Sequence, residues 1–482
     1  MVLDRWSCQI FFIMYQCSSI FSPMIRHVRL SIFLVVLMPW LTAKAWAEQR
    51  PNIIFILTDD MGYSDPGCYG GHFAPTPNID RLADEGIRFT HFYDDAPICS
   101  ASRCSYITGM FPAQWHFTTY LDNRAQNRSC EQADFLTTNA PALARVLKAS
   151  GYATGHFGKW HLGGGRDVTN APLFSAYGYD EHSGTYESPE PDPNITATHW
   201  IWSPKDKVKR WERTGYFVDH ALDFLKRHED QPCYVEIWPD DVHTPWVPDV
   251  QRESKRGTWE SRPNFSDVLA EYDRQLGRLF AGLKSLGIES NTLVVFTSDN
   301  GPLPNFKHAR TGGLRGSKLS LFEGGVRVPF IVRWPGHATP GRVDEQTVLE
   351  MVDLFPTFCA IAHASLPTGF DFAGENMLPA FDNHQTPHDK TIYWEYGRES
   401  NLFHYPGVPY DRSPHLAVRD GDWKLIVNPD GSDLQLYNLA SDQNETKNLA
   451  TVQVDVAQRL EKAALEWKKS LPAFPAASIP SM

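Results

Sequence analysis

Short apolar runs that end abruptly in acidic residues constrain the fold of this chain more than any other feature. Continuous apolar runs of five or six residues are typical of strands that are buried on both faces, as in a parallel sheet covered by helices. The runs cover residues 52–57, 234–238 and 292–296, and they lead into Asp59-Asp60, Asp240-Asp241 and Asp299-Asn300, respectively.

Amphipathic stretches lie between these runs. Their apolar spacing predicts helices over 78–86, 140–151, 218–227 and 267–287. The alternation of strands and helices predicts an α/β sandwich with a large, mostly parallel central sheet flanked by helices. In such folds, ligands bind at the carboxyl ends of the strands.

The pattern changes after about Gln385. Four short strand-like runs follow, over 391–397, 415–420, 422–428 and 434–438, and then a helical stretch over 454–469. This predicts a smaller C-terminal antiparallel sheet with one helix. We therefore expect a main domain over 48–385 and a subdomain with a tail over 386–482.

Residues 1–47 are typical of a leader that is removed. Two arginines precede the apolar run 30–41, which is too short to span a membrane comfortably, and Ala45-Trp46-Ala47 matches a signal-peptidase site. We expect cleavage after Ala47, with Met24 as a second candidate start. The mature chain would then lack a transmembrane span and be secreted or periplasmic, or lysosomal in an animal host. The alternative is an uncleaved N-terminal anchor.

Charge and cysteine content exclude several classes of protein. The formal charge of −12 argues against a nucleic-acid-binding surface, which needs an excess of Lys and Arg. Two of the eight cysteines, Cys8 and Cys17, fall in the leader. The others are widely spaced and form no CxxC pair, so neither a disulfide scaffold nor a zinc ribbon is expected.

Oxygen-bearing side chains follow two of the predicted strands. Asp59 and Asp60 end one strand, and Asp299 and Asn300 end another. Hard cations such as calcium or magnesium take carboxylate and amide oxygens as ligands. For each pair alone, and for Asp240-Asp241 in particular, a helix cap or turn is the simpler interpretation. Two pairs on two parallel strands favour a site for a divalent cation.

Basic side chains occur in similar positions. Lys159 and His161 follow a candidate strand, His243 follows the 234–238 run, and Lys318 lies in a glycine-rich stretch. Each alone is typical of a solvated side chain, but together they suit a tetrahedral anion, whose oxygens accept charge-assisted hydrogen bonds. The stretch GGLRGSK lacks the GxxxxGK[ST] spacing of a phosphate-binding loop.

The most specific pattern is APICSASRCSYITG, over 96–109. Cys99, Ser102, Arg103 and Thr108-Gly109 resemble the type I sulfatase maturation motif, C-x-P-S-R-x4-T-G, with Ala101 in place of the usual proline. A buried cysteine in a loop is the alternative interpretation. Other blocks resemble the same family in the same order: DDMG at 59–62, GKWHLG at 158–163, HTP at 243–245, SDNG at 298–301, LRGSK with FEGGVRVPFIVRWPG within 314–336, and GDWKL at 421–425.

On these blocks the chain is identified as a member of the type I sulfatase family, in the alkaline phosphatase superfamily, and it is similar to the arylsulfatase A and N-acetylgalactosamine-6-sulfatase branch. The resemblance implies that a maturation enzyme oxidises Cys99 to formylglycine, and that one divalent cation, calcium or alternatively magnesium, binds beside it. By the same resemblance, Asp59, Asp60, Asp299, Asn300 and residue 99 would hold the cation; Arg103 would support residue 99; Lys159 and His161 would contact its hydroxyls; Lys318 and His243 would bind sulfate; and Ser183 is the candidate for a serine contact.

The implied reaction is hydrolysis of a sulfate ester on a sulfated carbohydrate, such as a 6-sulfated N-acetylgalactosamine, or on an aryl sulfate. A hydroxyl of the hydrated aldehyde would attack sulfur, with Asp299 as candidate base, and form a covalent sulfated enzyme. His161 would then deprotonate the second hydroxyl and release sulfate. Two alternatives remain: a metal-dependent phosphoesterase of the same superfamily, which would need a Ser or Thr nucleophile, and an inactive relative that binds sulfated glycans.

Overall fold

An eight-stranded sheet forms the core of the chain. In the computed structural model, which describes residues 50–198, 202–387, 390–397 and 408–474, the strand order is β4-β3-β5-β1-β6-β7-β2-β8. Neighbouring strands are parallel except at β7, which runs antiparallel to β6 and β2. The mostly parallel sheet is confirmed. Its strands are β1 (Asn52–Thr58), β2 (Ile87–Tyr93), β3 (Ala153–Gly158), β4 (Glu181–Gly184), β5 (Cys233–Trp238), β6 (Thr292–Ser298), β7 (Arg327–Arg333) and β8 (Arg342–Glu350).

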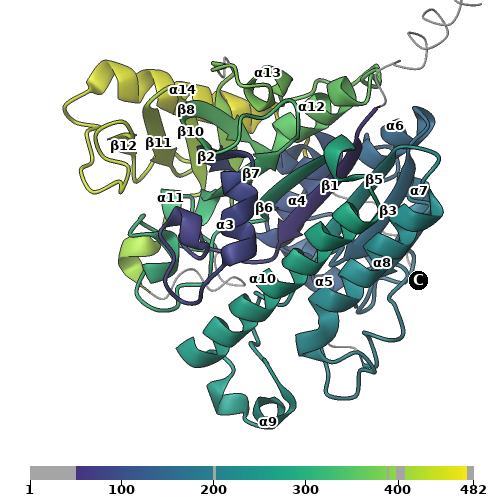
Figure 1. The fold of residues 1–482 in the computed structure, drawn as a ribbon. Coiled ribbons are helices and arrows are strands. Elements are labelled where there is room, and N and C mark those ends of the chain that lie inside the picture. Colours follow the sequence, from purple (N-terminus) through teal and green to yellow (C-terminus); the bar gives the residue numbers. More distant parts are fainter. Residues whose placement is uncertain (1–49, 199–201, 388–389, 398–407, 475–482) are drawn as a thin grey trace, which may run out of the picture. The chain divides into compact units, whose positions relative to one another are not determined.

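Helices cover both faces of this sheet, as the unbroken apolar strands require (Figure 1). Side chains alternate along β1, so Phe55 packs into the core on one face and Ile54 into the core on the other. One face is covered by α4 (Cys99–Thr108), α6 (Leu143–Ala149), α7 (Phe174–Tyr177), α12 (Leu354–Ile361) and α13 (Leu378–Phe381); the other by α3 (Pro77–Asp84), α8 (Arg213–Arg227) and α10 (Arg262–Ser285). The short helices α5 (Arg124–Ser129), α9 (Val250–Glu253) and α11 (Glu323–Val326) lie in the connections.

All four helices predicted ahead of residue 300 are present, with shifted starts. Helix α10 begins at Arg262, before the predicted 267, because the Ser261 side chain accepts a hydrogen bond from Asn264 N at 3.4 Å and Pro263 occupies the first turn. Helix α4 was not predicted. All of its residues are buried, so it lacks the amphipathic spacing by which a surface helix is recognised.

The predicted C-terminal antiparallel sheet is also confirmed. Its order is β12-β11-β10-β9, formed by β9 (Ile392–Glu395), β10 (Leu416–Asp420), β11 (Trp423–Val427) and β12 (Gln435–Asn438). Helix α14 (Val454–Ser470) packs on one face, where Leu460 meets the strands' apolar side chains. On the other face, Ala417 and Ile426 join the core of the large sheet. The boundary at 385 stays a prediction, and the leader over 1–47 lies outside the described residues.

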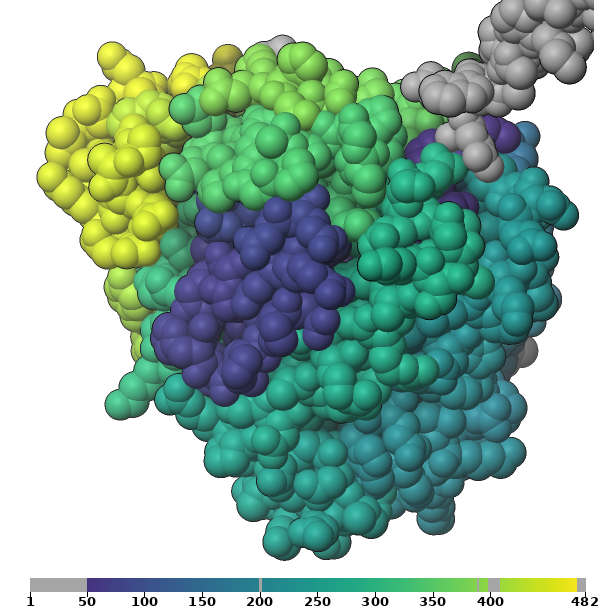
Figure 2. Space-filling model, viewed as in Figure 1, coloured from purple at the N-terminus to yellow at the C-terminus, as the bar shows by residue number. Residues whose placement is uncertain are grey.

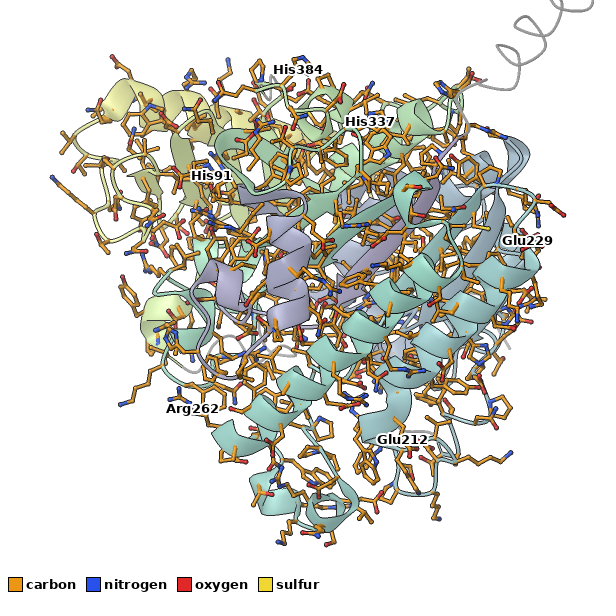
Figure 3. All side chains as sticks on the ribbon, in the orientation of Figure 1. His91, Glu212, Glu229, Arg262, His337 and His384 are labelled. Carbon is orange, nitrogen blue, oxygen red and sulfur yellow. The ribbon has the colours of Figure 1, made fainter. Side chains whose placement is uncertain are left out.

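Helices α8 and α10 begin at the same edge of the large sheet, which is the edge where its parallel strands end. Glu212, just before α8, and Arg262, the first residue of α10, both lie toward this edge, whereas Glu229 lies beyond the far end of α8 (Figure 3). The side chains of α3, α8 and α10 cover the sheet on this face (Figure 2). None of the described helices is long and apolar enough to cross a membrane.

Candidate active site

The two oxygen-rich pairs lie side by side because their strands are parallel neighbours. Strand β1 pairs with β6 so that Thr58 is opposite Ser298, and the next residues are Asp59 and Asp299. Asp60 N donates to Asp299 Oδ1 at 3.1 Å, and Asn300 Nδ2 donates to Asp60 Oδ1 at 2.8 Å. The structure thus brings together all four predicted oxygen ligands, and each is at most 1% exposed.

Helix α4 places the motif cysteine against these carboxylates. The Cys99 Sγ and one carboxylate oxygen each of Asp59 and Asp299 all lie within 4.8 Å of one another. Arg103 follows one turn later on the same face of the helix. Its Nε and Nη2 donate to Asp299 Oδ2 at 3.0 and 2.7 Å, and its Nη1 donates to Lys159 O at 2.7 Å.

The other residues of the motif determine where α4 begins and ends. Position 101 is the third residue of the helix, where the backbone N–H has no partner within the helix, so alanine and proline both suit the folded state. Thr108 Oγ1 donates to Cys104 O at 2.8 Å. Gly109 ends the helix with φ +64°, and a Cβ there would lie 2.7 Å from Phe355 Cβ. Cys99 is therefore buried at the start of a helix rather than in a loop.

Two lysines pair with the carboxylates of Asp59 and Asp60. Lys159, just after β3, places Nζ 3.0 and 2.9 Å from the two oxygens of Asp59. Lys318 Nζ lies 2.5 Å from Asp60 Oδ1 and 3.6 Å from Cys99 Sγ. Burial alone would lower the pKa of either lysine, but Asp59 or Asp60 and Cys99 raise both pKa values above the ordinary value. Both ammonium groups are therefore charged.

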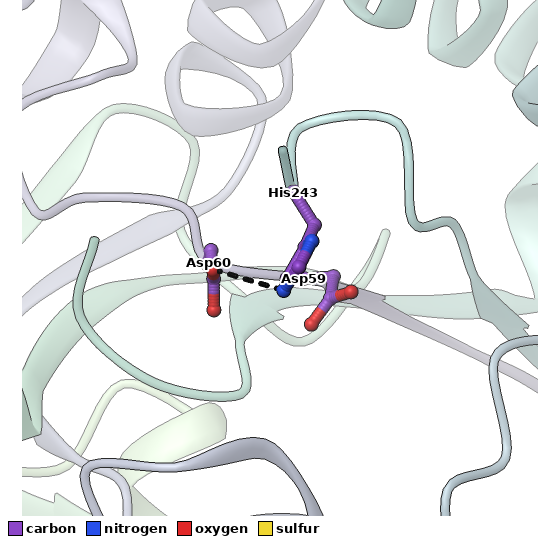
Figure 4. A group of neighbouring side chains, drawn as sticks. All are labelled: Asp59, Asp60 and His243. Atoms are coloured by element: carbon purple, nitrogen blue, oxygen red, sulfur yellow. Dashed lines mark ion pairs between the residues drawn. The ribbon is translucent and has the colours of Figure 1, made fainter. Parts of the chain in front are cut away.

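His161 and His243 complete the predicted set. His161 Nε2 lies 3.2 Å from both Leu121 O and Glu187 Oε2. His243 Nε2 lies 3.5 Å from Asp60 Oδ2, and its Nδ1 lies 2.5 Å from Thr244 O. The dashed line in Figure 4 marks the ion pair between His243 and Asp60. Burial, with the nearby lysines adding to it, lowers the pKa of His243, and it lowers that of His161 to about 4. Both rings are neutral at pH 7.

Two residues singled out in the sequence lie elsewhere. Ser183 is in β4, where its hydroxyl donates to Asp192 Oδ2 at 2.7 Å; no contact of Ser183 with Cys99 is found among the described residues, and its role stays a prediction. Asp240 accepts hydrogen bonds from Arg210 and Arg213, both at 2.6 Å. This buried ion pairing gives the Asp240 side chain a structural role, although not that of the helix cap expected from the sequence.

Glu187, which the sequence analysis missed, contacts His161. It lies in the loop that follows β4, and its carboxylate is 7% exposed. No periodicity or motif spacing pointed to this residue, because the contact joins two loops.

The donor set fits a divalent cation. Among the described residues, the buried Asp60 Oδ2 and Asn300 Oδ1 have no hydrogen-bond donor. Burial, followed by the charges of Asp59 and Cys99, raises the pKa of Asp299 well above its ordinary value in spite of Arg103. A bound cation would satisfy these two oxygens, which accept no hydrogen bond from the described residues, and would favour the charged form of the Asp299 carboxylate. Oxygen ligands of this kind suit calcium or magnesium.

Comparisons with known proteins agree with this geometry. A family model described as Sulfatase matches residues 51–364, and one described as N-sulphoglucosamine sulphohydrolase, C-terminal, matches residues 317–470. An N-acetylgalactosamine-6-O-sulfatase of Bacteroides thetaiotaomicron is 28% identical over 86% of this chain and 92% of its own length. The N-acetylgalactosamine-6-sulfatase of Homo sapiens is 33% identical over 69% of this chain and 66% of its own length.

Two further similarities cover most of the chain. Human arylsulfatase A is 30% identical over 81% of this chain and 78% of its own length. The crystal structure of Ps i-CgsB in complex with k-i-k-neocarrahexaose has a TM-score of 0.72 and 26% sequence identity, and the match covers 89% of this chain and 94% of that one.

Proposed function

This chain belongs to the sulfatase family and hydrolyses sulfate esters of glycans, and we propose that it does so through a formylglycine made from Cys99. The supporting observation is that Cys99 Sγ, Asp59 and Asp299 meet within 4.8 Å, with Lys318 3.6 Å from the sulfur. A cysteine that is only structural would have no need of a ring of buried charges. In the mature protein, the hydroxyls of a hydrated aldehyde would take the place of the sulfur atom.

Asp59, Asp60, Asp299 and Asn300 would hold one divalent cation, for which calcium is our first choice and magnesium the second. When bound, such a cation polarises the S–O bonds and favours the ionised form of a neighbouring hydroxyl. Among the described residues, Asp60 Oδ2 and Asn300 Oδ1 accept no hydrogen bond, which supports this assignment.

The chain's own residues would divide the remaining work. Lys159 and Lys318 are buried ammonium groups that offset the charge on the sulfate oxygens. The charged Lys318 would donate a proton to the departing alcohol oxygen. His243, whose Nδ1 contacts Thr244 O and whose Nε2 lies toward Asp60, would do so only when its ring is protonated. Asp299, next to residue 99, is the candidate base for the attack on sulfur.

The second half of the reaction explains why a cysteine would need conversion. After the sulfuryl group has been transferred to one hydroxyl, the carbon at position 99 still carries the other hydroxyl. His161 would remove its proton, the carbonyl would re-form, and sulfate would leave with the electron pair of the broken C–O bond. A serine sulfate has no neighbouring hydroxyl and would stay sulfated.

The substrate that we propose is a sulfated carbohydrate, and specifically a 6-sulfated N-acetylgalactosamine. Relatives named for this substrate cover about two thirds or more of the chain, which supports the choice. We also propose that the protein works outside the cytoplasm, after removal of residues 1–47, and depends on a formylglycine-generating enzyme.

The test is expression of the full chain with a maturation enzyme, followed by peptide mass spectrometry of position 99 and assays of released sulfate. We expect an aldehyde at residue 99 and sulfate release from 6-sulfated N-acetylgalactosamine saccharides and from an aryl sulfate, but not phosphate release from the matching aryl phosphate. Cys99→Ser should abolish turnover or leave a sulfated enzyme. Multiple turnover by that variant, or a preference for the phosphate, would refute the proposal.

A further inference from the structure

We propose that Glu187 is a positioning residue for His161, and that it fixes which ring nitrogen receives the proton when sulfate is expelled. The inference rests on the proposed function and goes beyond it, since the family motif does not include Glu187. Glu187 contacts His161 at two points.

The first point of attachment is the backbone. His161 lies in the left-handed region with φ +56°, which is uncommon outside glycine. Its N–H donates to Glu187 O at 3.0 Å. The glycines after Leu162 let the two loops approach, because a Cβ at Gly164 would lie 2.3 Å from Ser188 C. The loop at 186–189 therefore sets the position of the His161 backbone.

The second point of attachment is the ring. His161 Nε2 lies 3.2 Å from Glu187 Oε2 and 3.2 Å from Leu121 O. Both neighbours are acceptors, so this nitrogen must carry the proton. Nδ1 is then the unprotonated atom; it is buried and has no hydrogen-bond partner in the described part of the chain. Nδ1 is the ring atom left to accept a proton. The Leu121 backbone that contacts Nε2 also contacts the helix of residue 99, since Leu121 N donates to Ser100 Oγ at 3.0 Å, and we infer that the proton comes from a hydroxyl on residue 99.

Glu187 is itself held in place. Arg166 Nη2 lies 2.8 Å from Glu187 Oε1, and Arg166 Nη1 lies 2.9 Å from Asp122 Oδ1. Burial alone would raise the pKa of Glu187, but His161, Arg166 and Lys159 hold it below the ordinary value. The carboxylate is therefore ionised and fixed, as required of a group that orients a neutral imidazole.

The role predicts a defect in one half of the reaction. In Glu187→Gln, the amide no longer supplies a charged acceptor, and the ring of His161 gains freedom to rotate or to change tautomer. The attack on sulfur does not use His161, so the alcohol is still released. Expulsion of sulfate is slowed, and the sulfated enzyme accumulates. Partners that orient a metal-bound histidine typically contribute roughly 10- to 100-fold to activity, and we expect a loss of that order for this histidine as well.

The experiment uses the full chain, matured at position 99, with 4-nitrophenyl sulfate as the probe. For Glu187→Gln we expect a burst of about one equivalent of alcohol, a kcat lowered roughly 10- to 100-fold, little change in KM, and a sulfuryl adduct in the intact mass. The matched control is Glu190→Gln. Glu190 lies in the same loop and faces His182, 3.6 Å away, so this variant should behave like wild type.

Two further measurements separate positioning from general destabilisation. In a His161→Ala background, Glu187→Gln should have no additional effect on kcat, because the two residues act as a unit. Arg166→Met, which removes a partly exposed side chain, should give the same burst with a smaller loss.

The inference is overturned if Glu187→Gln has wild-type kcat, if it loses activity without a sulfated enzyme, or if its effect persists in the His161→Ala background. A wild-type chain that lacks aldehyde and releases no sulfate would instead refute the proposed function.

Discussion

Replacing Arg103 with methionine tests how the buried carboxylates of the site are held together. The Arg103 side chain is fully buried and donates twice to Asp299 and once to Lys159 O. Methionine fills similar space but offers no hydrogen bond and no charge. The variant therefore leaves the Asp299 carboxylate in the interior without its main partner.

The magnitude follows from burial. Removing one partner of a buried ion pair costs about 3–5 kcal/mol, because the other charge stays desolvated. For the described residues after Arg50, the entropy of unfolding is roughly 0.9 kcal/mol/K. The Tm should therefore fall by about 3–6 °C. Since Arg103 also sets the position of α4 against Asp299, kcat/KM should fall by roughly 100-fold or more.

The assay is thermal unfolding at neutral pH together with hydrolysis of an aryl sulfate. Arg227→Met is the control: Arg227 pairs with Glu181 at 2.5 Å, but its side chain is 46% exposed. An exposed pair contributes about 0–1 kcal/mol, so the control should lose about 1 °C or less and keep its activity. If Arg103→Met melts like Arg227→Met and still turns over substrate, the charge balance that we assign to Arg103 is wrong.

Two further predictions concern the cation and a second buried charge cluster. Calcium at about 100 times its Kd should stabilise the wild-type protein by about 2.7 kcal/mol relative to the EDTA-treated protein, and Asn300→Leu should lose most of this shift in the same melts. A shift retained in the variant would exclude Asn300 as a ligand. Burial raises the pKa of Glu445 to about 7, although Lys424, which it shares with Glu323, lies 3.1 Å away. Because the folded-state pKa of Glu445 lies above the ordinary value, Glu445 stabilises the folded protein at low pH, and this stabilisation is lost as the pH rises through about 7. Glu445→Gln should therefore raise the Tm at about pH 8 but not at about pH 5, and an equal effect at both would contradict this.

The sequence predicted the part of the site that the sheet itself determines. Asp59 and Asp299 were found because each follows a buried apolar strand, and parallel neighbours end at the same edge. Lys159 was found in the same way, since β3 runs parallel to β5 in the same sheet. These positions could be predicted from the strand ends because the apolar side chains of a buried strand fix its register.

The parts that the sequence left open depend on contacts between loops or on complete burial. Glu187 reaches His161 only because the glycines at 163–165 allow the backbones to approach, and no residue pattern encodes that distance. The reversed strand β7 is buried like the parallel strands of the same sheet, so its direction could not be predicted from composition. Helix α4 could not be predicted because it is buried on every side and therefore has no polar face.

From the distribution of charge in the site we expect the cation and the substrate to bind cooperatively. Three carboxylic side chains face three cationic ones, namely Asp59, Asp60 and Asp299 against Lys159, Lys318 and Arg103. The lysines are therefore largely occupied by the carboxylates. A divalent cation would take over these oxygens and release the ammonium groups toward an anion. Inorganic sulfate should then bind at least tenfold more tightly with calcium than after EDTA treatment, a difference of about 1.4 kcal/mol by isothermal titration calorimetry. Equal affinity under both conditions would mean that the lysines already face the anion, and that the cation acts on the nucleophile alone.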